Sequence, residues 1–98
     1  MILPIFVRPE AEAEIQDAYG WYEKNRQGLG DEFVLSFEAC LFAIQRHPTS
    51  YPKVHQEIRR ALLKRFPYGV FYLKNNRRIT IIAVFHVKRN PQKWRERA

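Results

Sequence analysis

Several features are scarce in this 98-residue chain, and each shortage excludes a class of protein. The chain holds one cysteine, Cys40, so it forms neither an internal disulfide nor a zinc site built from paired thiolates. That composition is typical of a reducing cytoplasm. No stretch approaches the roughly 20 apolar residues that a membrane-spanning helix needs. The apolar start, residues 2–7, is too short for a secretion signal. We therefore expect a cytoplasmic protein without a membrane segment.

The compact motifs of nucleotide-binding and metal enzymes are also missing. The sequence has no glycine-rich phosphate loop, no paired cysteines and no His-x-x-x-His spacing. Its three histidines, His47, His55 and His86, stand far apart. We therefore expect no metal site and no cofactor.

Acidic residues are nearly absent from the second half of the chain. Residues 1–50 carry four basic and eight acidic residues, whereas residues 51–98 carry thirteen basic residues against Glu57 and Glu96 alone. The formal net charges of the two halves are therefore −4 and +11, within a total of +7. A basic surface of this kind favours an anionic partner, either nucleic acid or an acidic polypeptide, although it also serves solubility.

The residues that are present suit one small domain over residues 1–98. Hydrophobic residues make up 46% of the chain, and a chain of this length supports a single core. An apolar run at residues 2–7 contains Pro4, which cannot donate to a β-ladder, so it predicts an edge strand. The following segment, up to Pro48, has the spacing of two helices.

Proline and apolar periodicity indicate where these helices begin and end. Pro9 suits a first helical turn, and we expect the first helix to end near Asn25. Residues 27–30 predict a turn, after which apolar residues again recur every three or four positions until Pro48 stops the second helix. The first half is thus predicted to be a helical hairpin. Its core is expected to include the aromatic residues of the first helix, Tyr19, Trp21 and Tyr22.

The second half predicts a sheet. Residues 48–57 contain two prolines and show no periodicity, so we expect a loop there. Residues 58–66, 69–74 and 78–87 are rich in β-branched and aromatic residues and predict three strands in a meander. Both alternating faces of the last strand are apolar, which is typical of a central strand covered on both sides.

A short helix is expected after the last strand. Asn90 and Pro91 are suited to its start, and Trp94 is its expected anchor. The element order predicts an α+β fold, in which an N-terminal strand and a helical hairpin pack on an antiparallel sheet that is followed by a short C-terminal helix.

His86 ends the last predicted strand, within the basic part of the chain. RNA cleavage by the 2′-hydroxyl needs a general base, a general acid and cations beside the phosphate. His86 has the chemistry of a base or an acid, Glu57 that of a partner carboxylate, and the candidate cations are Arg59, Arg60, Lys64 and Arg89. The alternative is structural, with His86 hydrogen-bonded at the sheet end and the arginines forming a solvated face. Tyr68 and Tyr72 suit either a half-buried strand or a nucleic-acid surface.

Several short motifs, in their order and spacing, are similar to one family. They are Val7-Arg8-Pro9-Glu10-Ala11, Trp21-Tyr22-Glu23, Gly28-Leu29-Gly30-Asp31-Glu32-Phe33, Pro48 with Tyr51-Pro52, Arg59-Arg60-Ala61-Leu62-Leu63, Phe66-Pro67-Tyr68-Gly69-Val70-Phe71-Tyr72, and Ala83-Val84-Phe85-His86 with Arg89, Pro91 and Trp94. Nearly end to end, the chain resembles the RelE/ParE superfamily of bacterial type II toxins, also described as plasmid stabilisation proteins. The fold of that family agrees with the one that periodicity predicts.

The resemblance implies a toxin that a cognate antitoxin neutralises within a hetero-oligomer. The antitoxin would wrap an acidic, partly disordered segment over the sheet and the hairpin, which fits the basic second half. The residues expected to bind this antitoxin or the toxin's target are basic or aromatic: Arg59, Lys64, Arg65, Tyr68, Tyr72, Lys88, Trp94 and Arg95.

The superfamily has two branches with different targets. RelE-like members are mRNA interferases that cleave messages in the ribosome, whereas ParE-like members poison DNA gyrase. RelE-like ribonucleases carry a catalytic arginine just after the first tyrosine of the strand that begins at Tyr68, where this chain has Gly69. In the preceding strand one of two basic positions is matched by Arg60 and the other falls on Leu62, while His86 matches a strand-end histidine that some ribonucleases use.

The motifs Trp-Tyr-Glu, Gly-Leu-Gly and Phe-Pro-Tyr look more like the ParE branch, so we expect a gyrase poison. One alternative is a ribosome-dependent mRNA endonuclease whose catalytic residues are Arg60, His86 and Arg89. Another is an inactive basic binding module that still binds an antitoxin.

Overall fold

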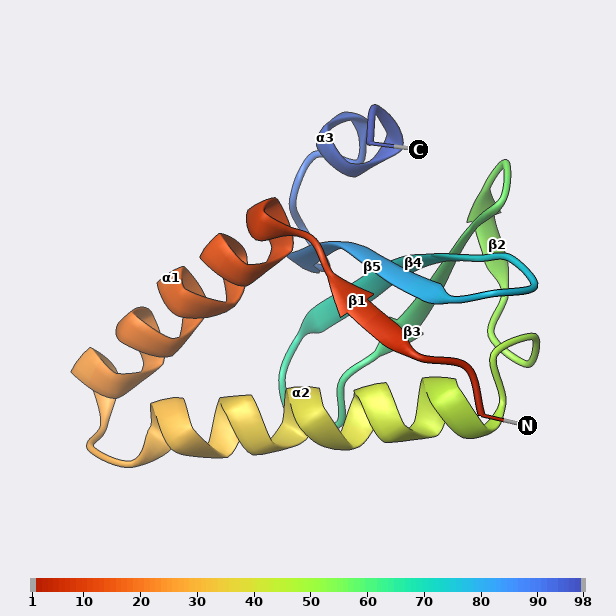
Figure 1. Cartoon of the computed structure of the whole chain (residues 1–98). Helices are drawn as coiled ribbons and strands as arrows, with labels where there is room; N and C mark the ends of the chain where they lie inside the picture. Colours follow the sequence, from red (N-terminus) through yellow and green to blue (C-terminus); the bar gives the residue numbers. More distant parts are fainter. Residues whose placement is uncertain (1, 98) are drawn as a thin grey trace.

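The computed structural model describes residues 2–97, and it consists of one sheet with helices on both faces (Figure 1). The five strands lie in the order β1-β5-β4-β3-β2. The elements are β1 (Ile5–Val7), α1 (Pro9–Asn25), α2 (Leu29–Arg46), β2 (Lys53–His55), β3 (Ile58–Leu62), β4 (Tyr68–Lys74), β5 (Ile79–His86) and α3 (Gln92–Arg95). Within the described residues, no helix is long and apolar enough to cross a membrane.

The predicted helical hairpin is confirmed, and a glutamate fixes its turn. The Glu23 carboxylate accepts hydrogen bonds from the backbone N–H groups of Gly28 and Gly30, each at 3.0 Å. The helices approach so closely here that a β-carbon on Gly30 would lie 2.8 Å from the Tyr19 carbonyl oxygen. Glycine is therefore needed at position 30 for the two helices to meet.

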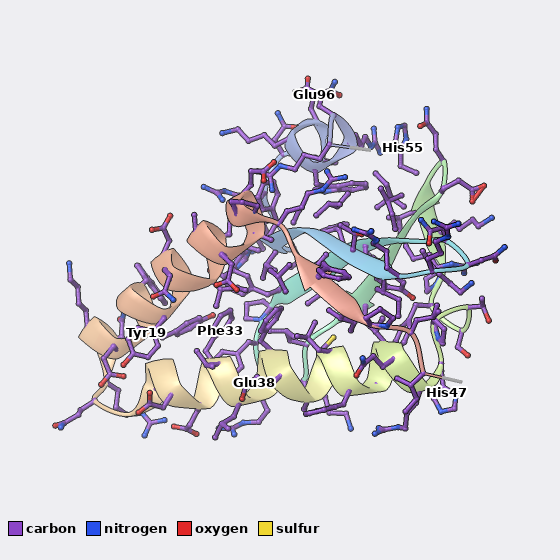
Figure 2. All side chains as sticks on the ribbon, in the orientation of Figure 1. Tyr19, Phe33, Glu38, His47, His55 and Glu96 are labelled. Atoms are coloured by element: carbon purple, nitrogen blue, oxygen red, sulfur yellow. The ribbon has the colours of Figure 1, made fainter. Side chains whose placement is uncertain are left out.

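The larger core lies between this hairpin and one face of the sheet. Phe33 is fully buried there and points into the space between the helices and the strands (Figure 2). Its ring stacks on Tyr22 with 5.4 Å between ring centroids, and Tyr22 in turn meets the edge of Phe66 at 4.9 Å. Aromatic contacts of this geometry stabilise a core beyond the area they bury.

A second, smaller core lies on the opposite face, under α3. Trp94 is buried and stacks on Phe71 with 4.3 Å between ring centroids. Ile58, Ile82, Ala83 and Phe85 complete this cluster. β5 is therefore covered on both faces, as its sequence predicts, because α3 packs on the side opposite the hairpin.

Two features of the sheet differ from the expectation. β1 runs parallel to β5, with Ile5 opposite Ile79 and Val7 opposite Ile81, so the sheet is mixed rather than wholly antiparallel. Two helices and three strands separate β1 from β5 in the sequence. This long crossover lets β5 return beside β1 in the same direction, so the two strands pair in parallel. In addition, the segment expected to be a loop contains β2, which pairs with β3 and places Lys53 opposite Arg59.

Two smaller expectations are also corrected. The strand predicted for residues 58–66 ends at Leu62, because the chain turns back at Arg65, whose φ is 72°. Trp21 does not belong to the core: it is 60% exposed, since the buried stripe of α1 runs through Ala18 and Tyr22 and leaves position 21 outside it.

Candidate functional site

Three residues that come from separate parts of the sequence meet at the C-terminal end of β5. Arg60 from β3, His86 from β5 and Arg89 from the following loop line one cavity of about 70 Å³. The other lining residues are Gly69, Phe71, Val87, Pro91 and Trp94, and none of the eight is acidic. We call this cavity the basic pocket. It unites all three residues that the sequence singles out as ribonuclease candidates.

Arg60 owes its position to the glycine on the neighbouring strand. A β-carbon on Gly69 would lie 3.1 Å from Arg60 Cδ and 3.2 Å from Arg60 Cγ, so the arginine stem occupies the space that a side chain at position 69 would need. The Nε–H of Arg60 is buried and has no hydrogen-bond acceptor among the described residues. A buried donor without a partner is costly, so this site carries an unmet hydrogen bond.

The hydrogen bond that His86 makes determines which nitrogen carries its proton. The backbone N–H of Lys88 donates to His86 Nδ1 at 3.1 Å. A nitrogen that accepts a hydrogen bond carries no proton, so in the neutral ring the proton resides on Nε2. His86 thus offers a donor at Nε2, and a role as general base would require this bond to break.

Arg89 is held by the loop that follows β5. Its backbone N–H donates to the His86 carbonyl at 2.9 Å, and its guanidinium carbon lies 5.1 Å from the centre of the Phe85 ring. A cation over an aromatic face is attracted to it. These two contacts place the Arg89 charge beside His86.

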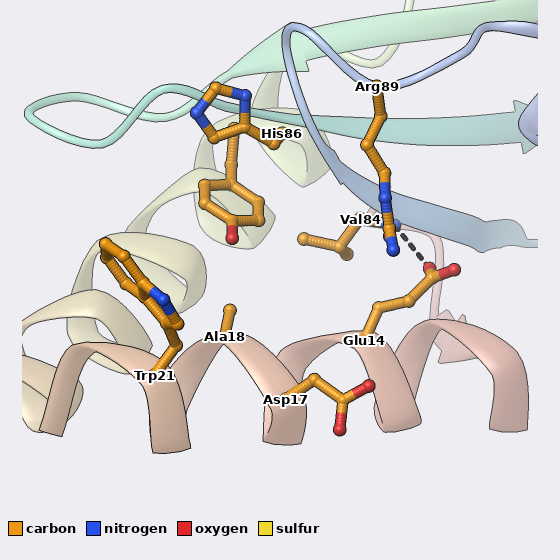
Figure 3. A pocket seen from close by; sticks show the side chains of 8 residues that line it. Glu14, Asp17, Ala18, Trp21, Val84, His86 and Arg89 are labelled. Atoms are coloured by element: carbon orange, nitrogen blue, oxygen red, sulfur yellow. Dashed lines mark hydrogen bonds between the residues drawn. The ribbon is translucent and has the colours of Figure 1, made fainter. Parts of the chain in front are cut away.

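A wider groove of about 290 Å³ adjoins the basic pocket, and His86 and Arg89 line both (Figure 3). Trp21, Ala18, Asp17 and Glu14 rise from α1 on one side of the groove. Tyr68 lies on the other side, its ring centroid 5.4 Å from that of His86. The exposed Trp21 side chain, which was expected in the core, therefore lines this groove.

The acidic wall of the groove is partly neutralised by an arginine that sequence analysis missed. Glu14 Oε2 accepts from Arg97 Nη2 at 2.7 Å, and Glu14 Oε1 accepts from the Val84 backbone N–H at 2.9 Å. Arg97 also donates to the Ile82 carbonyl at 2.9 Å. The Glu14–Arg97 pair thus binds the Val84 N–H and the Ile82 carbonyl, which lie on the edge of β5 beyond the end of β1. It also links the segment after α3 to α1. One signal was available: Glu14 falls on the apolar stripe of α1, between Ala11 and Ala18.

Three of the expected partner-binding residues have structural positions instead. Tyr72 is fully buried and its hydroxyl donates to the Pro48 carbonyl at 2.8 Å; this burial raises the pKa of Tyr72 to about 12. Trp94 is buried against Phe71. Arg59 Nη1 donates to the Tyr51 carbonyl at 2.6 Å and so holds the segment before β2. The expectation of a partner contact is corrected for Tyr72 and Trp94, because the two cores enclose them.

The remaining expected residues lie on the surface. Lys64, Lys88 and Arg95 are exposed, and Arg65 is exposed but pairs with Glu32 at 2.8 Å. Glu57, expected as a partner carboxylate for His86, lines neither the basic pocket nor the groove; it pairs with Lys53 at 2.8 Å across the β2–β3 turn. Among residues 2–97, no group of three or more histidine, cysteine or acidic side chains is placed to hold a metal ion.

A separate apolar groove lies along the free edge of β1. It has a volume of about 380 Å³ and is lined by residues of β1 and α2: Ile5, Val7, Glu38, Leu41, Phe42 and Gln45. Phe42 on α2 is 61% exposed, and Phe6 on β1, which lies outside the groove lining, is 50% exposed. Exposed apolar groups gathered at a sheet edge are typical of a surface that a partner covers.

Residues 5–91 match the family model described as the ParE toxin of the type II toxin-antitoxin system, parDE. The chain also resembles a solved structure from P. aeruginosa described as a chromosomal ParDE TA system, with a TM-score of 0.77 and 15% sequence identity. The likeness covers 87% of this chain and 96% of that one, and it shows a shared fold. No curated protein matches the chain.

Proposed function

The chain belongs to the ParE toxin family of type II toxin-antitoxin systems, and from this premise we propose that it arrests growth by poisoning DNA gyrase in the bacterial cytoplasm. The family match over residues 5–91 carries the proposal, because it spans the helical hairpin, the whole sheet and the loop that bears Arg89.

The geometry of the basic pocket supports a toxin that binds its target without cutting RNA. His86 Nδ1 accepts a backbone hydrogen bond and is therefore not available as a general base. The place of the arginine that RelE-like ribonucleases carry is taken by Gly69 and filled by the stem of Arg60. Both observations favour the gyrase-directed branch.

We further propose that the antitoxin covers the apolar groove between β1 and α2. An extended segment with apolar residues would add to the free edge of β1, where it would cover Phe42 on the groove side and Phe6 on the opposite face of the sheet. Arg78 lies 4.8 Å above the Phe6 ring, so acidic residues of the segment would meet a cation at this edge. Covering this groove would join toxin and antitoxin in a hetero-oligomer.

One observation favours a second candidate, an mRNA endonuclease of the RelE type. Arg60, His86 and Arg89 line one cavity, as the active site of a ribonuclease would require. In that function the two arginines would stabilise the phosphate under attack. His86 would act as general acid only with both ring nitrogens protonated, which requires the Lys88 hydrogen bond to Nδ1 to break. A residue outside the basic pocket would have to act as the general base.

Expression of the chain without an antitoxin separates these functions. We would follow growth, messenger integrity and gyrase-bound DNA breaks in the same cultures, for the wild type and for the Arg60→Ala/His86→Ala double variant. Arg77→Ala serves as the charge control, because Arg77 is exposed in the β4–β5 turn and lines neither cavity.

The gyrase proposal predicts arrest with trapped DNA breaks and intact messages. Arrest with cut messages that only the double variant abolishes would establish the endonuclease and refute the gyrase proposal. Normal growth would leave an inactive module whose remaining role is to bind an antitoxin.

A further inference from the structure

We propose that the basic pocket binds a single phosphate group, either free or as part of a nucleic-acid backbone. The inference goes beyond the proposed function, because poisoning gyrase through protein contacts requires no phosphate site. It also differs from the endonuclease candidate, because the phosphate is held and not cleaved.

The electrostatics of the pocket favour an anion. Two guanidinium groups, from Arg60 and Arg89, line it without any acidic residue among the lining set. Two carboxylates stand on the adjoining wall: Glu14 is already bound by Arg97 and by the Val84 N–H, and Asp17 lines the groove but not the pocket. The residues that line the pocket itself therefore carry positive charge without a carboxylate beside it.

The side chains that supply N–H donors to the pocket lining come from three separate segments. They are Arg60 on β3, His86 on β5 and Arg89 in the loop after β5. The Nε–H of Arg60 is buried behind this lining without an acceptor among the described residues. A tetrahedral phosphate has oxygens directed to several sides and satisfies donors that converge in this way. A carboxylate has two coplanar oxygens and fits the arrangement less well.

Size and surroundings agree with this assignment. A volume of about 70 Å³ suits a phosphate group and is too small for a nucleoside. The adjoining groove is larger, at about 290 Å³, and both Trp21 and Tyr68 line it; the Trp21 ring is seen in Figure 3. Aromatic side chains beside a basic site are typical of surfaces on which nucleic-acid bases stack. A nucleotide whose phosphate is bound in the pocket would thus place its nucleoside in the groove.

Contacts within the protein hold the two arginines of this pocket in place. The Arg60 stem is supported by the bare backbone of Gly69, and Arg89 rests on the Phe85 ring at 5.1 Å. Trp94 and Pro91 close the pocket from the side of α3. The cations are therefore held in place before binding, which lowers the entropic cost of binding.

The test is a ¹⁵N NMR titration that follows the Nε–H signals of the arginine side chains in the full chain. Inorganic phosphate, a 5′-mononucleotide and a short single-stranded oligonucleotide are added at constant ionic strength, with chloride as the control. We expect saturable shifts of the Arg60 and Arg89 signals, while the Arg77 signal stays in place. Saturation by inorganic phosphate indicates a site for the free group, and saturation by the oligonucleotide alone indicates a backbone phosphate; both support the proposal.

Matched variants strengthen the test. We expect Arg60→Gln and Arg89→Gln each to weaken binding at least about tenfold, as for the loss of a charged hydrogen bond, and Arg77→Gln to change it less than about twofold. Equal, non-saturating shifts of all arginine signals would overturn the proposal in favour of a diffuse basic surface. A Glu-rich peptide that shifts the Arg60 signal where no phosphate compound does would overturn it in favour of a carboxylate pocket.

Discussion

Arg60 on β3 lies diagonally across from Gly69 on β4, and the stem of the arginine fills the space above the glycine. A β-carbon at position 69 would stand 3.1 Å from Arg60 Cδ. Arg60 lines the basic pocket, and its Nε–H is buried without an acceptor among the described residues. The missing side chain at position 69 thus leaves the space in which the Arg60 stem is held.

Gly69→Ala is expected to disturb the pocket more than the fold. The added methyl group must displace the flexible Arg60 stem, while alanine restrains the unfolded chain, so we expect the free energy of unfolding to change by less than about 1 kcal/mol. The Arg60 Nε–H signal should nevertheless move in a ¹⁵N spectrum. A loss of several kcal/mol, measured by urea unfolding, would contradict this description of the contact.

Gly30→Ala should destabilise the protein, unlike the same change at Gly20. A β-carbon at position 30 would meet the Tyr19 carbonyl oxygen at 2.8 Å and force the helices apart, so we expect a loss of about 1–3 kcal/mol. At Gly20 nothing lies within 4 Å, and alanine should stabilise α1 by about 0.5–1 kcal/mol. Urea unfolding of both variants measures the difference, and similar values for the two would refute the close approach.

The Glu14–Arg97 pair is expected to be worth more than an ordinary surface ion pair. Their side chains are 13% and 20% exposed, so Arg97→Gln leaves a mostly buried carboxylate without its cation, and we expect a loss of about 2–3 kcal/mol, below the value for a fully buried pair. Arg95→Gln on the exposed side of α3 is the matched control and should cost less than about 0.5 kcal/mol. An equal loss of unfolding free energy in Arg97→Gln and Arg95→Gln would show that the Glu14–Arg97 pair adds no stability.

Glu32 makes stability depend on pH at the acidic end. Its hydrogen bond to Arg65, helped by the charges of Arg26 and Arg65, lowers the pKa of Glu32 below 4.5 in the folded state. A lowered folded pKa means that this contribution is present at neutral pH and is lost as the pH falls from about 4.5 through the folded pKa. In Arg65→Gln the NMR-measured pKa of Glu32 should rise toward 4.5, and an unchanged value would exclude the contact.

Cys40 should be chemically silent in the folded protein. Burial raises the pKa of its thiol to about 11, so only about one molecule in a thousand carries a thiolate at pH 8. Reaction with a thiol reagent at that pH should be slow in buffer and fast in urea. Rapid labelling without urea would show that the face of α2 bearing Cys40 opens in the native state.

Local patterns were sufficient to predict most of the elements. Pro9 and Pro48 mark the limits of the hairpin, and the two apolar faces of β5 predicted that it is a central strand. Both signals depend only on residues close together in the sequence. The parallel pairing of β1 with β5 was missed, since it depends on where a crossover returns. β2 was missed because three residues are too few to show a period.

The candidate site was predicted only in its residue types. Arg60, His86 and Arg89 were singled out by chemistry, and the fold brings them to one cavity. The burial of Trp94 agrees with its expected role as the anchor of the C-terminal helix. Tyr72 and Trp94 were also expected at a partner surface, because an aromatic residue among arginines has the same sequence pattern in a core and on a surface. The Arg97–Glu14 contact joins residues 83 positions apart, a distance at which no spacing rule applies.

Purified gyrase offers the most direct test of the proposed function. The chain is added in molar excess to gyrase, relaxed plasmid and ATP, and the DNA is examined after protease and detergent treatment. A gyrase poison predicts that supercoiling stops and that linear, gyrase-cleaved plasmid accumulates. Supercoiling at the full rate with no cleaved DNA would contradict it.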